Sequence, residues 1–464
     1  MRTLLCNGTV VNATGRTRAD VLVSDGRVEA VAPGLQAAAD RILDASGRLL
    51  LPGGIDVHTH LDLPMGGFST SDDFESGTIA AACGGTTTLI DYATQEKGGS
   101  LGGALDQWMA RAADRAVIDF GFHLAIADLR PEVEHEIEAM VAAGVPSFKL
   151  YMAYPGRLML DDGAIFRVLR RTAACGGLVC LHAENGHVID VLAREALAAG
   201  HTSPRYHTLT RPPLAEAEAI HRGLALARLA GAPLYIVHLS SAEGLEEVVA
   251  ARRRGDLVMA ETCPQYLLLS SEDEAWDGDS FDGARAVMSP PLRARASQDA
   301  LWGGLARGEV DTVATDHCPF LLADKARGRG DFTRIPNGAP GIEHRMSLLY
   351  DAGVAAGRMT LERFVEVTAA APARIFGLAP RKGAIVPGAD ADLLVFDPAG
   401  STRVSTAAQH MRVDYNLYDG RTLAGAIDMV MARGEVIVER GAFVGQPGRG
   451  RFLKRAAWST VGRV

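Results

Sequence analysis

The 464-residue sequence predicts an α/β fold, a (β/α)8 barrel joined to a smaller, discontinuous β-sandwich domain. Three observations support this prediction. Eight short apolar segments with strand character alternate with stretches of helical periodicity. Several of these segments end in residues that can bind a metal ion. Further strand-like runs occur near both ends of the chain and remain available for a second domain.

Strand-like runs near the two chain ends are separated by Gly-containing turns such as Asp25-Gly26. They cover residues 3–11, 19–24, 27–32, 392–396, 426–433 and 435–439. We therefore expect residues 1–52 and 379–445 to form one β-sandwich domain and residues 53–378 to form the barrel. The Gly- and Arg-rich residues 446–464 are expected to be a tail that lies across a partner subunit or is loose.

The expected barrel strands are apolar and short, as buried parallel strands are. In chain order they are residues 54–60, 86–92, 120–127, 147–152, 178–183, 234–239, 257–261 and 310–315. Intervening stretches carry apolar residues at helical spacing and end near glycine; they include 131–143, 161–174, 213–230 and 242–254. Eight such βα units predict a TIM-type barrel.

Composition excludes several classes of protein. The formal charge is -9, so no basic stripe for nucleic acid is expected, and no run reaches the roughly 18 apolar residues that span a bilayer. The N-terminus lacks the pattern of a secretory signal. The six cysteines form no CxxC pair, which is typical of free thiols in a reducing compartment. A cytoplasmic protein without membrane or nucleic-acid partners is therefore expected.

Metal-binding residue types occur where the expected strands end, which is where such barrels carry their active sites. His58 and His60 project from one face of their strand, because side chains along a strand alternate. Neutral imidazoles are good zinc ligands, although two of them do not complete a site. The strand ends supply the remaining candidates: Lys149, His182, His238 and Asp316. Together they predict a metal site at the barrel mouth.

Lys149 is unusual because only five of the 47 basic residues are lysines. A lysine ammonium has no lone pair for a metal ion. Desolvation and neighbouring cations favour the neutral amine, which can add carbon dioxide to form a carbamate whose two oxygens can bridge two metals. The alternative is a lysine that extends from a strand edge into solvent.

Several motifs in the same order carry a resemblance to a known family. They are residues 58–62, 73–75, 84–87, 148–154, 182–186, 262–267, 289–293, 315–318 and 335–338. These motifs resemble those of the dihydropyrimidinase and hydantoinase family, the cyclic amidohydrolases within the amidohydrolase superfamily. The resemblance covers nearly the whole chain.

The resemblance implies a binuclear zinc centre. According to this resemblance, one Zn²⁺ is held by His58, His60, Asp316 and an N6-carboxylated Lys149. The second Zn²⁺ is held by Lys149, His182 and His238. A hydroxide would also bridge the two ions. The family commonly forms homotetramers, so a homotetramer or homodimer is expected.

The resemblance also implies the reaction and its residues. The ring amide of dihydrouracil, dihydrothymine or a 5-substituted hydantoin would be hydrolysed to an N-carbamoyl amino acid, as in pyrimidine catabolism. Tyr154 would stabilise the oxyanion and Asp316 would carry the proton to the ring nitrogen. Main-chain groups of Ser289 and Asn337 would recognise the ring. An apolar lid would comprise Leu63, Met65, Tyr151 and Leu158.

Other polar residues near these motifs are expected to support the site without binding metal. His317 follows Asp316 and points the other way, so a supporting contact is expected, whereas His123 is expected in the core. Glu184, Asn185 and Arg293 are expected to surround the site or stabilise the fold.

Three alternatives remain within the same superfamily. Dihydroorotases typically carry an arginine at the position of Asp62, so a carboxylate-bearing ring is disfavoured. Allantoinases usually place a Glu-Pro-Gly element where this chain has residues 63–67, yet an allantoinase stays open as an alternative. A non-catalytic scaffold homologue would lack the metal ligands, all of which are present here.

Overall fold

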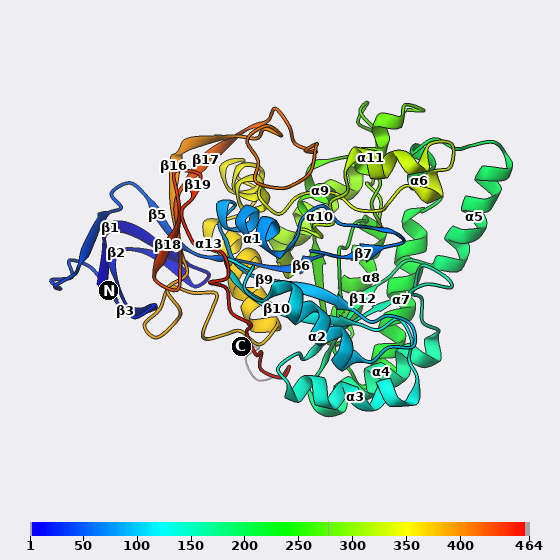
Figure 1. The fold of residues 1–464 in the computed structure, drawn as a ribbon, viewed down its shortest axis with the longest axis horizontal. Helices are drawn as coiled ribbons and strands as arrows, with labels where there is room; N and C mark the ends of the chain where they lie inside the picture. Colours follow the sequence, from blue (N-terminus) through cyan, green and yellow to red (C-terminus); the bar gives the residue numbers. More distant parts are fainter. Residues whose placement is uncertain (1, 277, 460–464) are drawn as a thin grey trace.

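The computed structural model describes residues 2–276 and 278–459, and an eight-stranded parallel barrel forms its centre (Figure 1). Its strands are β6 (Gly54–Thr59), β9 (Thr86–Thr94), β10 (Asp119–Ala125), β11 (Ser147–Tyr151), β12 (Leu178–His182), β13 (Leu234–Ile236), β14 (Val258–Thr262) and β15 (Thr312–Val313). Each strand pairs with its neighbour in this order, in parallel. All eight expected strands are confirmed.

The barrel closes between its first and last strands by a few contacts beyond the ends of the regular ladder. Thr59 forms a bridge with His317, and the His60 N–H donates to the His317 carbonyl at 2.9 Å. Below this bridge the Thr315 N–H donates to Asp56 Oδ1 at 3.1 Å. Closure therefore places the chain around His58 and His60 directly beside Asp316.

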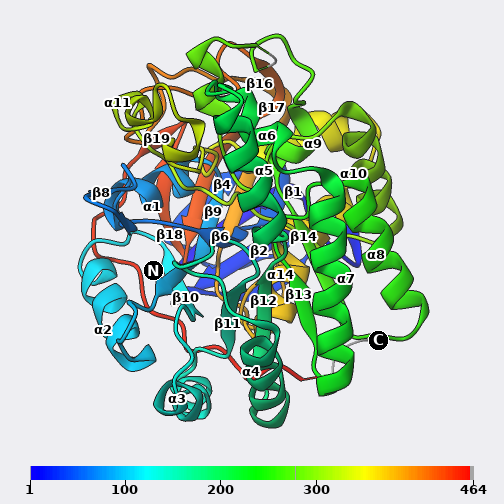
Figure 2. The same ribbon diagram turned by 90° about the vertical axis from the view of Figure 1, so that its right-hand side faces the viewer.

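Helices surround the strands, as Figure 2 shows. The longer ones are α1 (Phe74–Cys83), α2 (Leu101–Ala112), α3 (Pro131–Ala142), α4 (Asp162–Cys175), α5 (Gly186–Ala198), α7 (Pro213–Ala230), α8 (Ala242–Arg253) and α10 (Arg295–Arg307). Shorter helices are α6 (Arg205–Leu209), α9 (Pro264–Leu268), α11 (Leu322–Lys325), α12 (Arg345–Leu349), α13 (Leu361–Val365) and α14 (Ala371–Ile375). Single 3₁₀ or π turns are η1 (Phe281–Ala286), η2 (Ala326–Gly328), η3 (Phe332–Arg334), η4 (Tyr350–Ala355) and η5 (Glu366–Ala370). The four helical stretches expected from the sequence are confirmed.

Helix α4 illustrates why these segments are helical. Asp161 caps its start, because the carboxylate accepts the Ala164 N–H at 2.7 Å. The helix ends at Gly176, whose φ of 74° is a left-handed conformation that suits glycine. Its buried residues, which include Ile165 and Leu169, recur at helical spacing and face the barrel.

The two chain ends form one nine-stranded sheet beside the barrel, as expected (Figure 1). Its strands are β1 (Arg2–Asn12), β2 (Gly15–Ser24), β3 (Arg27–Ala32), β4 (Arg41–Asp44), β5 (Leu49–Pro52), β16 (Leu393–Arg403), β17 (Thr422–Ala432), β18 (Glu435–Glu439) and β19 (Ala442–Phe443). Strand β5 joins the halves, because it pairs with β1 and with β16. Leu50 packs within the sheet domain, whereas the adjacent Leu51 belongs to the main core cluster with the barrel.

The tail does not behave as expected over residues 446–459, which pack against the chain's own barrel. The Phe120 N–H donates to the Arg451 carbonyl at 3.0 Å, and the Leu453 N–H donates to the Phe120 carbonyl at 2.7 Å. Arg455 is buried and donates to Ser147 Oγ at 2.7 Å. The expectation that this segment is loose is therefore wrong for these residues, whereas its contact with a partner subunit stays a prediction. Residues 460–464 lie outside the described residues.

Three further features bear on the expectations. A small hairpin, β7 (Pro64–Met65) and β8 (Phe68–Ser69), follows β6 and was not expected. All six cysteines are free. Among the described residues, the structure contains no helix with the length and apolar character needed to span a membrane. The division of the chain at residues 52, 378 and 445 stays a prediction.

Candidate active site

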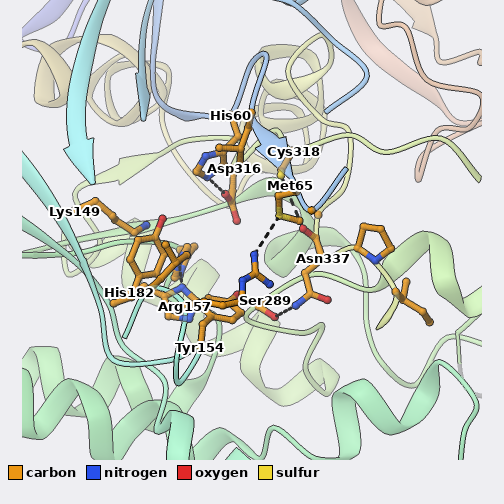
Figure 3. A pocket seen from close by; sticks show the side chains of 18 of the residues that line it. His60, Met65, Lys149, Tyr154, Arg157, His182, Ser289, Asp316, Cys318 and Asn337 are labelled. Carbon is orange, nitrogen blue, oxygen red and sulfur yellow. Dashed lines mark hydrogen bonds and ion pairs between the residues drawn. The ribbon is translucent and has the colours of Figure 1, made fainter. Parts of the chain in front are cut away.

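A cavity of about 550 Å³ opens at the carboxyl ends of the barrel strands (Figure 3). Every residue that the sequence nominated for metal binding, catalysis, ring recognition or the lid lines it. They are His58, His60, Leu63, Met65, Lys149, Tyr151, Tyr154, Leu158, His182, His238, Ser289, Asp316 and Asn337. Segments far apart in the chain thus converge on one site.

The first group of candidate ligands is formed by β6 and the segment after β15. Asp316 Oδ1 lies 3.0 Å from His58 Nε2 and 3.2 Å from His60 Nε2. Ligand atoms about 2.1 Å from a zinc ion in tetrahedral geometry lie roughly 3.4 Å apart, so these spacings fit one ion after small adjustments. Glu261 Oε1 contacts His58 Nδ1 at 2.6 Å, which directs the other ring nitrogen toward the group.

The second group comprises His182, at the end of β12, and His238, which follows β13. His182 Nδ1 and His238 Nε2 are 2.9 Å apart, a spacing that two ligands of one ion also show. His182 Nε2 contacts Glu184 Oε2 at 2.9 Å, so that carboxylate orients the ring without entering the group itself. Glu184 therefore supports the site, as expected.

Lys149 lies beside the first group, with Nζ 3.5 Å from His58 Nε2. Its side chain is only 1% exposed and forms no ion pair with a carboxylate in the part of the chain that the structure describes. Burial lowers the pKa of Lys149 to about 8, against the opposing effect of Asp316 and Glu261. Nζ also lies 4.7 Å from the centre of the Tyr92 ring. The lowered pKa makes the neutral amine of Lys149 easier to form, and the neutral amine is the form that can be carboxylated.

Three of the four candidate histidine ligands, His60, His182 and His238, are held in the uncharged form that binds metals. Burial lowers the pKa of His60 to about 4 and also lowers the pKa of His182 and His238. Although burial opposes its ionisation, contacts with His58 and His60 hold the pKa of Asp316 well below its usual range. His58 differs: although burial and Lys149 oppose it, Asp316 and Glu261 raise its pKa. The donor set therefore combines four imidazoles, three of them with a lowered pKa, with an ionised carboxylate, and these donor types fit zinc.

Three residues of the cavity have left-handed backbone conformations. The φ angles are 65° for Tyr154, 40° for His238 and 53° for Asp316. Such conformations are costly for residues other than glycine and cluster at functional sites. They direct side chains of three different segments toward the same space.

Tyr154, Ser289 and Asn337 lie on the side of the cavity opposite His60 (Figure 3). Asn337 Nδ2 donates to Ser289 Oγ at 3.2 Å, so the two loops contact each other. Burial, reinforced by Glu184, raises the pKa of Tyr154 to about 12. The Tyr154 hydroxyl is therefore a stable hydrogen-bond donor at neutral pH.

The supporting residues lie as the sequence suggested. His317 Nε2 contacts Asp72 Oδ2 at 3.0 Å, and its Nδ1 accepts the Gly341 N–H at 3.1 Å. His123 is buried and contacts Ser147 Oγ at 2.6 Å. Arg293 pairs with Glu216 at 3.2 Å and does not line the cavity. Asn185 caps helix α5.

Some residues of the site were missed from the sequence. Glu261 orients His58 and lies in an expected strand, so the strand-end rule that found the histidines could have found it too. Arg157 and Arg211 also line the cavity, but they lie in loops and carry no local signal. Asp62 does not line the cavity, and its Oδ2 lies 3.9 Å from Arg115 Nη1.

Comparison with known proteins agrees with this geometry. The amidohydrolase family model matches residues 49–437. A D-hydantoinase of Streptomyces coelicolor is 48% identical over 461 residues, covering 98% of each chain. A D-hydantoinase of Geobacillus stearothermophilus is 46% identical over 464 residues, covering 99% of this chain and 98% of that protein.

A solved structure extends the similarity to three dimensions. The crystal structure of dihydropyrimidinase from Brevibacillus agri NCHU1002 superposes with a TM-score of 0.97 at 46% identity, covering 99% of this chain and 100% of that one. The chain therefore belongs to the amidohydrolase family, within its dihydropyrimidinase and hydantoinase group, and is a hydrolase that acts on cyclic amides.

Proposed function

We propose that the enzyme is a binuclear zinc hydrolase that opens dihydropyrimidines, 5-substituted hydantoins or both to N-carbamoyl amino acids. The observation that carries the proposal is the pair of ligand groups, His58–His60–Asp316 and His182–His238, beside the buried Lys149. Neither group alone supplies the four ligands of a zinc ion, and a carboxylated Lys149 would add an anionic ligand to each.

Each zinc ion would have its own set of ligands among these residues. His58, His60, Asp316 and carboxylated Lys149 would hold one zinc, and Lys149, His182 and His238 would hold the other. When bound, zinc supplies Lewis acidity and lowers the pKa of water, so that hydroxide is available at neutral pH.

Main-chain groups beside the cavity are free to orient the ring. The N–H groups of Ser289 and Asn337 have no hydrogen-bond partner within residues 2–276 and 278–459. An imide edge presents alternating donors and acceptors, which main-chain N–H and C=O groups can match. These two loops would therefore fix the ring amide toward His60 and Asp316.

Asp316 is suited to move the proton. Its contacts with His58 and His60 both involve Oδ1, and this leaves Oδ2 for proton transfer. Oδ2 would accept the proton of the attacking water and deliver it to the departing ring nitrogen. The Tyr154 hydroxyl would donate to the oxygen that becomes negative when the ring carbonyl is attacked.

The hairpin and the loop after β11 supply apolar contacts for the exocyclic substituent. Leu63, Met65 and Leu158 line the cavity beside these segments, while Tyr151 at the end of β11 forms part of its wall. They would cover the group at ring position 5. The resemblance further favours a cytoplasmic homotetramer or homodimer in pyrimidine catabolism, and sedimentation of the purified enzyme tests the assembly.

A substrate panel tests the proposal. Protein purified with zinc and bicarbonate is assayed with dihydrouracil, dihydrothymine, alkyl and aryl hydantoins of both hands, and allantoin. We expect ring opening of dihydropyrimidines or hydantoins, with about two zinc ions per chain. Opening of allantoin alone would contradict the substrate assignment. Less than about one zinc per chain would contradict the metal assignment.

A further inference from the structure

Lys325, at the end of α11, is a buried lysine that does not line the cavity. Its side chain is 0% exposed. Nζ donates to three main-chain carbonyls, those of Val287 at 3.0 Å, Pro336 at 3.0 Å and Gly338 at 2.8 Å. An ammonium has three N–H donors, so each donor meets one acceptor.

The three carbonyls belong to the two loops that carry Ser289 and Asn337. Pro336 and Gly338 flank Asn337, and Val287 lies two residues before Ser289. The Gly338 N–H also donates to the Val287 carbonyl at 3.0 Å. Lys325 is therefore the point at which both ring-facing loops are joined.

Stability alone does not account for this arrangement. Lys325 forms no ion pair with a carboxylate among the residues that the structure describes, and burial lowers its pKa to about 7, so the ammonium form is present at and below neutral pH. A buried charge without a counter-charge is costly, and an apolar side chain in its place would avoid that cost. Since the chain uses lysine at only five positions, a three-donor group here points to a specific need.

The contact with Pro336 has an electronic consequence for the cavity. The Pro336 carbonyl and the Asn337 N–H belong to one peptide unit. A cation on the carbonyl oxygen polarises that unit and strengthens its N–H as a donor. The Asn337 N–H has no partner in the described part of the chain, and Asn337 lines the cavity.

We propose that Lys325 is a positioning residue for ring recognition. Its ammonium holds the Ser289 and Asn337 loops at a fixed spacing and strengthens the Asn337 N–H toward the imide edge of the substrate. The inference rests on the proposed function, because it assigns a substrate to those two loops. Lys325 itself touches neither the ring nor the reacting atoms.

The test compares Lys325→Met with wild type, using Lys454→Met as a matched control at an exposed lysine. Steady-state kinetics are measured on whichever ring of the panel the wild type opens, together with zinc content and the unfolding temperature. We expect KM to rise about tenfold or more in Lys325→Met, with kcat within about threefold and zinc content unchanged. The control should match wild type in all of these values.

A chemical rescue separates recognition from folding. Lys325→Ala removes the side chain beyond Cβ, and propylammonium can then bind in the space left behind. We expect propylammonium to lower KM toward the wild-type value, while propanol of the same size does not. A purely structural role would change the amount of folded enzyme but not KM.

Several outcomes would overturn the inference. These are a wild-type KM in Lys325→Met, or a smaller yield of folded protein whose KM is unchanged. If the Met variant does not fold, Lys325→Gln is measured instead, because it keeps two N–H donors without the charge. A wild-type KM in Lys325→Gln would also overturn the inference. If the wild type opens no ring of the panel, the proposed function fails separately. Calorimetric binding of hydantoin to wild type and variant then still decides the role of Lys325.

Discussion

Two regions of this molecule bury a lysine in opposite ways. At the junction between the barrel floor and the sheet, Lys382 Nζ lies 2.8 Å from Asp119, 3.0 Å from Asp390 and 2.6 Å from Asp392. At the barrel mouth, Lys149 is equally buried, yet it forms no ion pair with a carboxylate in the described residues. Although burial opposes it, the three aspartates raise the pKa of Lys382, whereas burial lowers the pKa of Lys149.

The difference indicates that the junction around Lys382 serves stability, whereas the barrel mouth around Lys149 is suited to chemistry. Charges at the junction are neutralised, so this region joins two domains with little cost from desolvation. The mouth keeps polar groups without partners and left-handed conformations at Tyr154, His238 and Asp316, which a ligand can compensate. Barrels commonly divide in this way, with chemistry at the carboxyl ends of the strands and stability at the opposite ends.

The largest effect is expected for Lys149→Ala. Loss of the proposed shared ligand should lower kcat/KM by about 10³-fold or more, because bound zinc would supply several kcal/mol of transition-state stabilisation. Short carboxylic acids should restore part of the activity, since they can replace the carbamate. Activity and zinc content are measured with and without acetate. An unrescued variant with wild-type activity would refute the shared ligand.

Lys382→Met should affect stability instead. It leaves Asp392 without its cation, while Asp119 keeps Arg433 and Asp390 keeps Arg381, and breaking a buried ion pair costs about 3–5 kcal/mol. Chemical denaturation of metal-free protein measures this loss, while kcat/KM of the folded fraction stays near wild type. In the same assay Lys149→Met should be no less stable than wild type. Equal losses in both variants would remove the contrast between the two regions.

Tyr154→Phe tests the mouth without touching a candidate metal ligand. Removal of one oxyanion donor should lower kcat by about 10²–10³-fold, with zinc content and unfolding free energy close to wild type. Tyr92→Phe serves as a control, because Tyr92 does not line the cavity and the substitution keeps the ring that contacts His58 and Lys149. A similar loss of kcat in both variants would argue against a specific donor at Tyr154.

The smallest effect concerns acid stability of the junction. Although burial opposes it, Lys382 lowers the pKa of Asp390. A carboxyl group with a lowered folded-state pKa stabilises the protein above its unfolded pKa of about 3.9, and that contribution is lost as pH falls through the folded value. The difference in unfolding free energy between wild type and Lys382→Met should therefore be constant from pH 7 to about 5 and shrink below about pH 4. A difference that does not depend on pH would contradict this coupling.

The barrel strands and the candidate metal ligands could be predicted because both depend on local sequence patterns. The eight barrel strands are short apolar runs whose identity depends on nearby residues, and strand-end placement found His58, His60, Lys149, His182, His238 and Asp316. The bounds of β13 and β15 were less predictable. Residues 237–239 and 314–315 continue the expected strands in the sequence, but they lie outside the regular strands of the structure. The roles of Arg157 and Lys325 could not be inferred, because their partners lie in other segments of the chain. Arg211 contacts the nearby His207, and only the fold brings it to the cavity.

The sequence by itself determined the order of βα units, the donor types at the strand ends and the presence of one lysine suited to carboxylation. These features depend on local periodicity and on side-chain chemistry. Only the tertiary structure decided that Glu261 orients His58, that Lys325 joins the loops of Ser289 and Asn337, and that residues 446–459 return to the barrel. Such contacts join segments far apart in the chain, and their geometry depends on how the barrel closes.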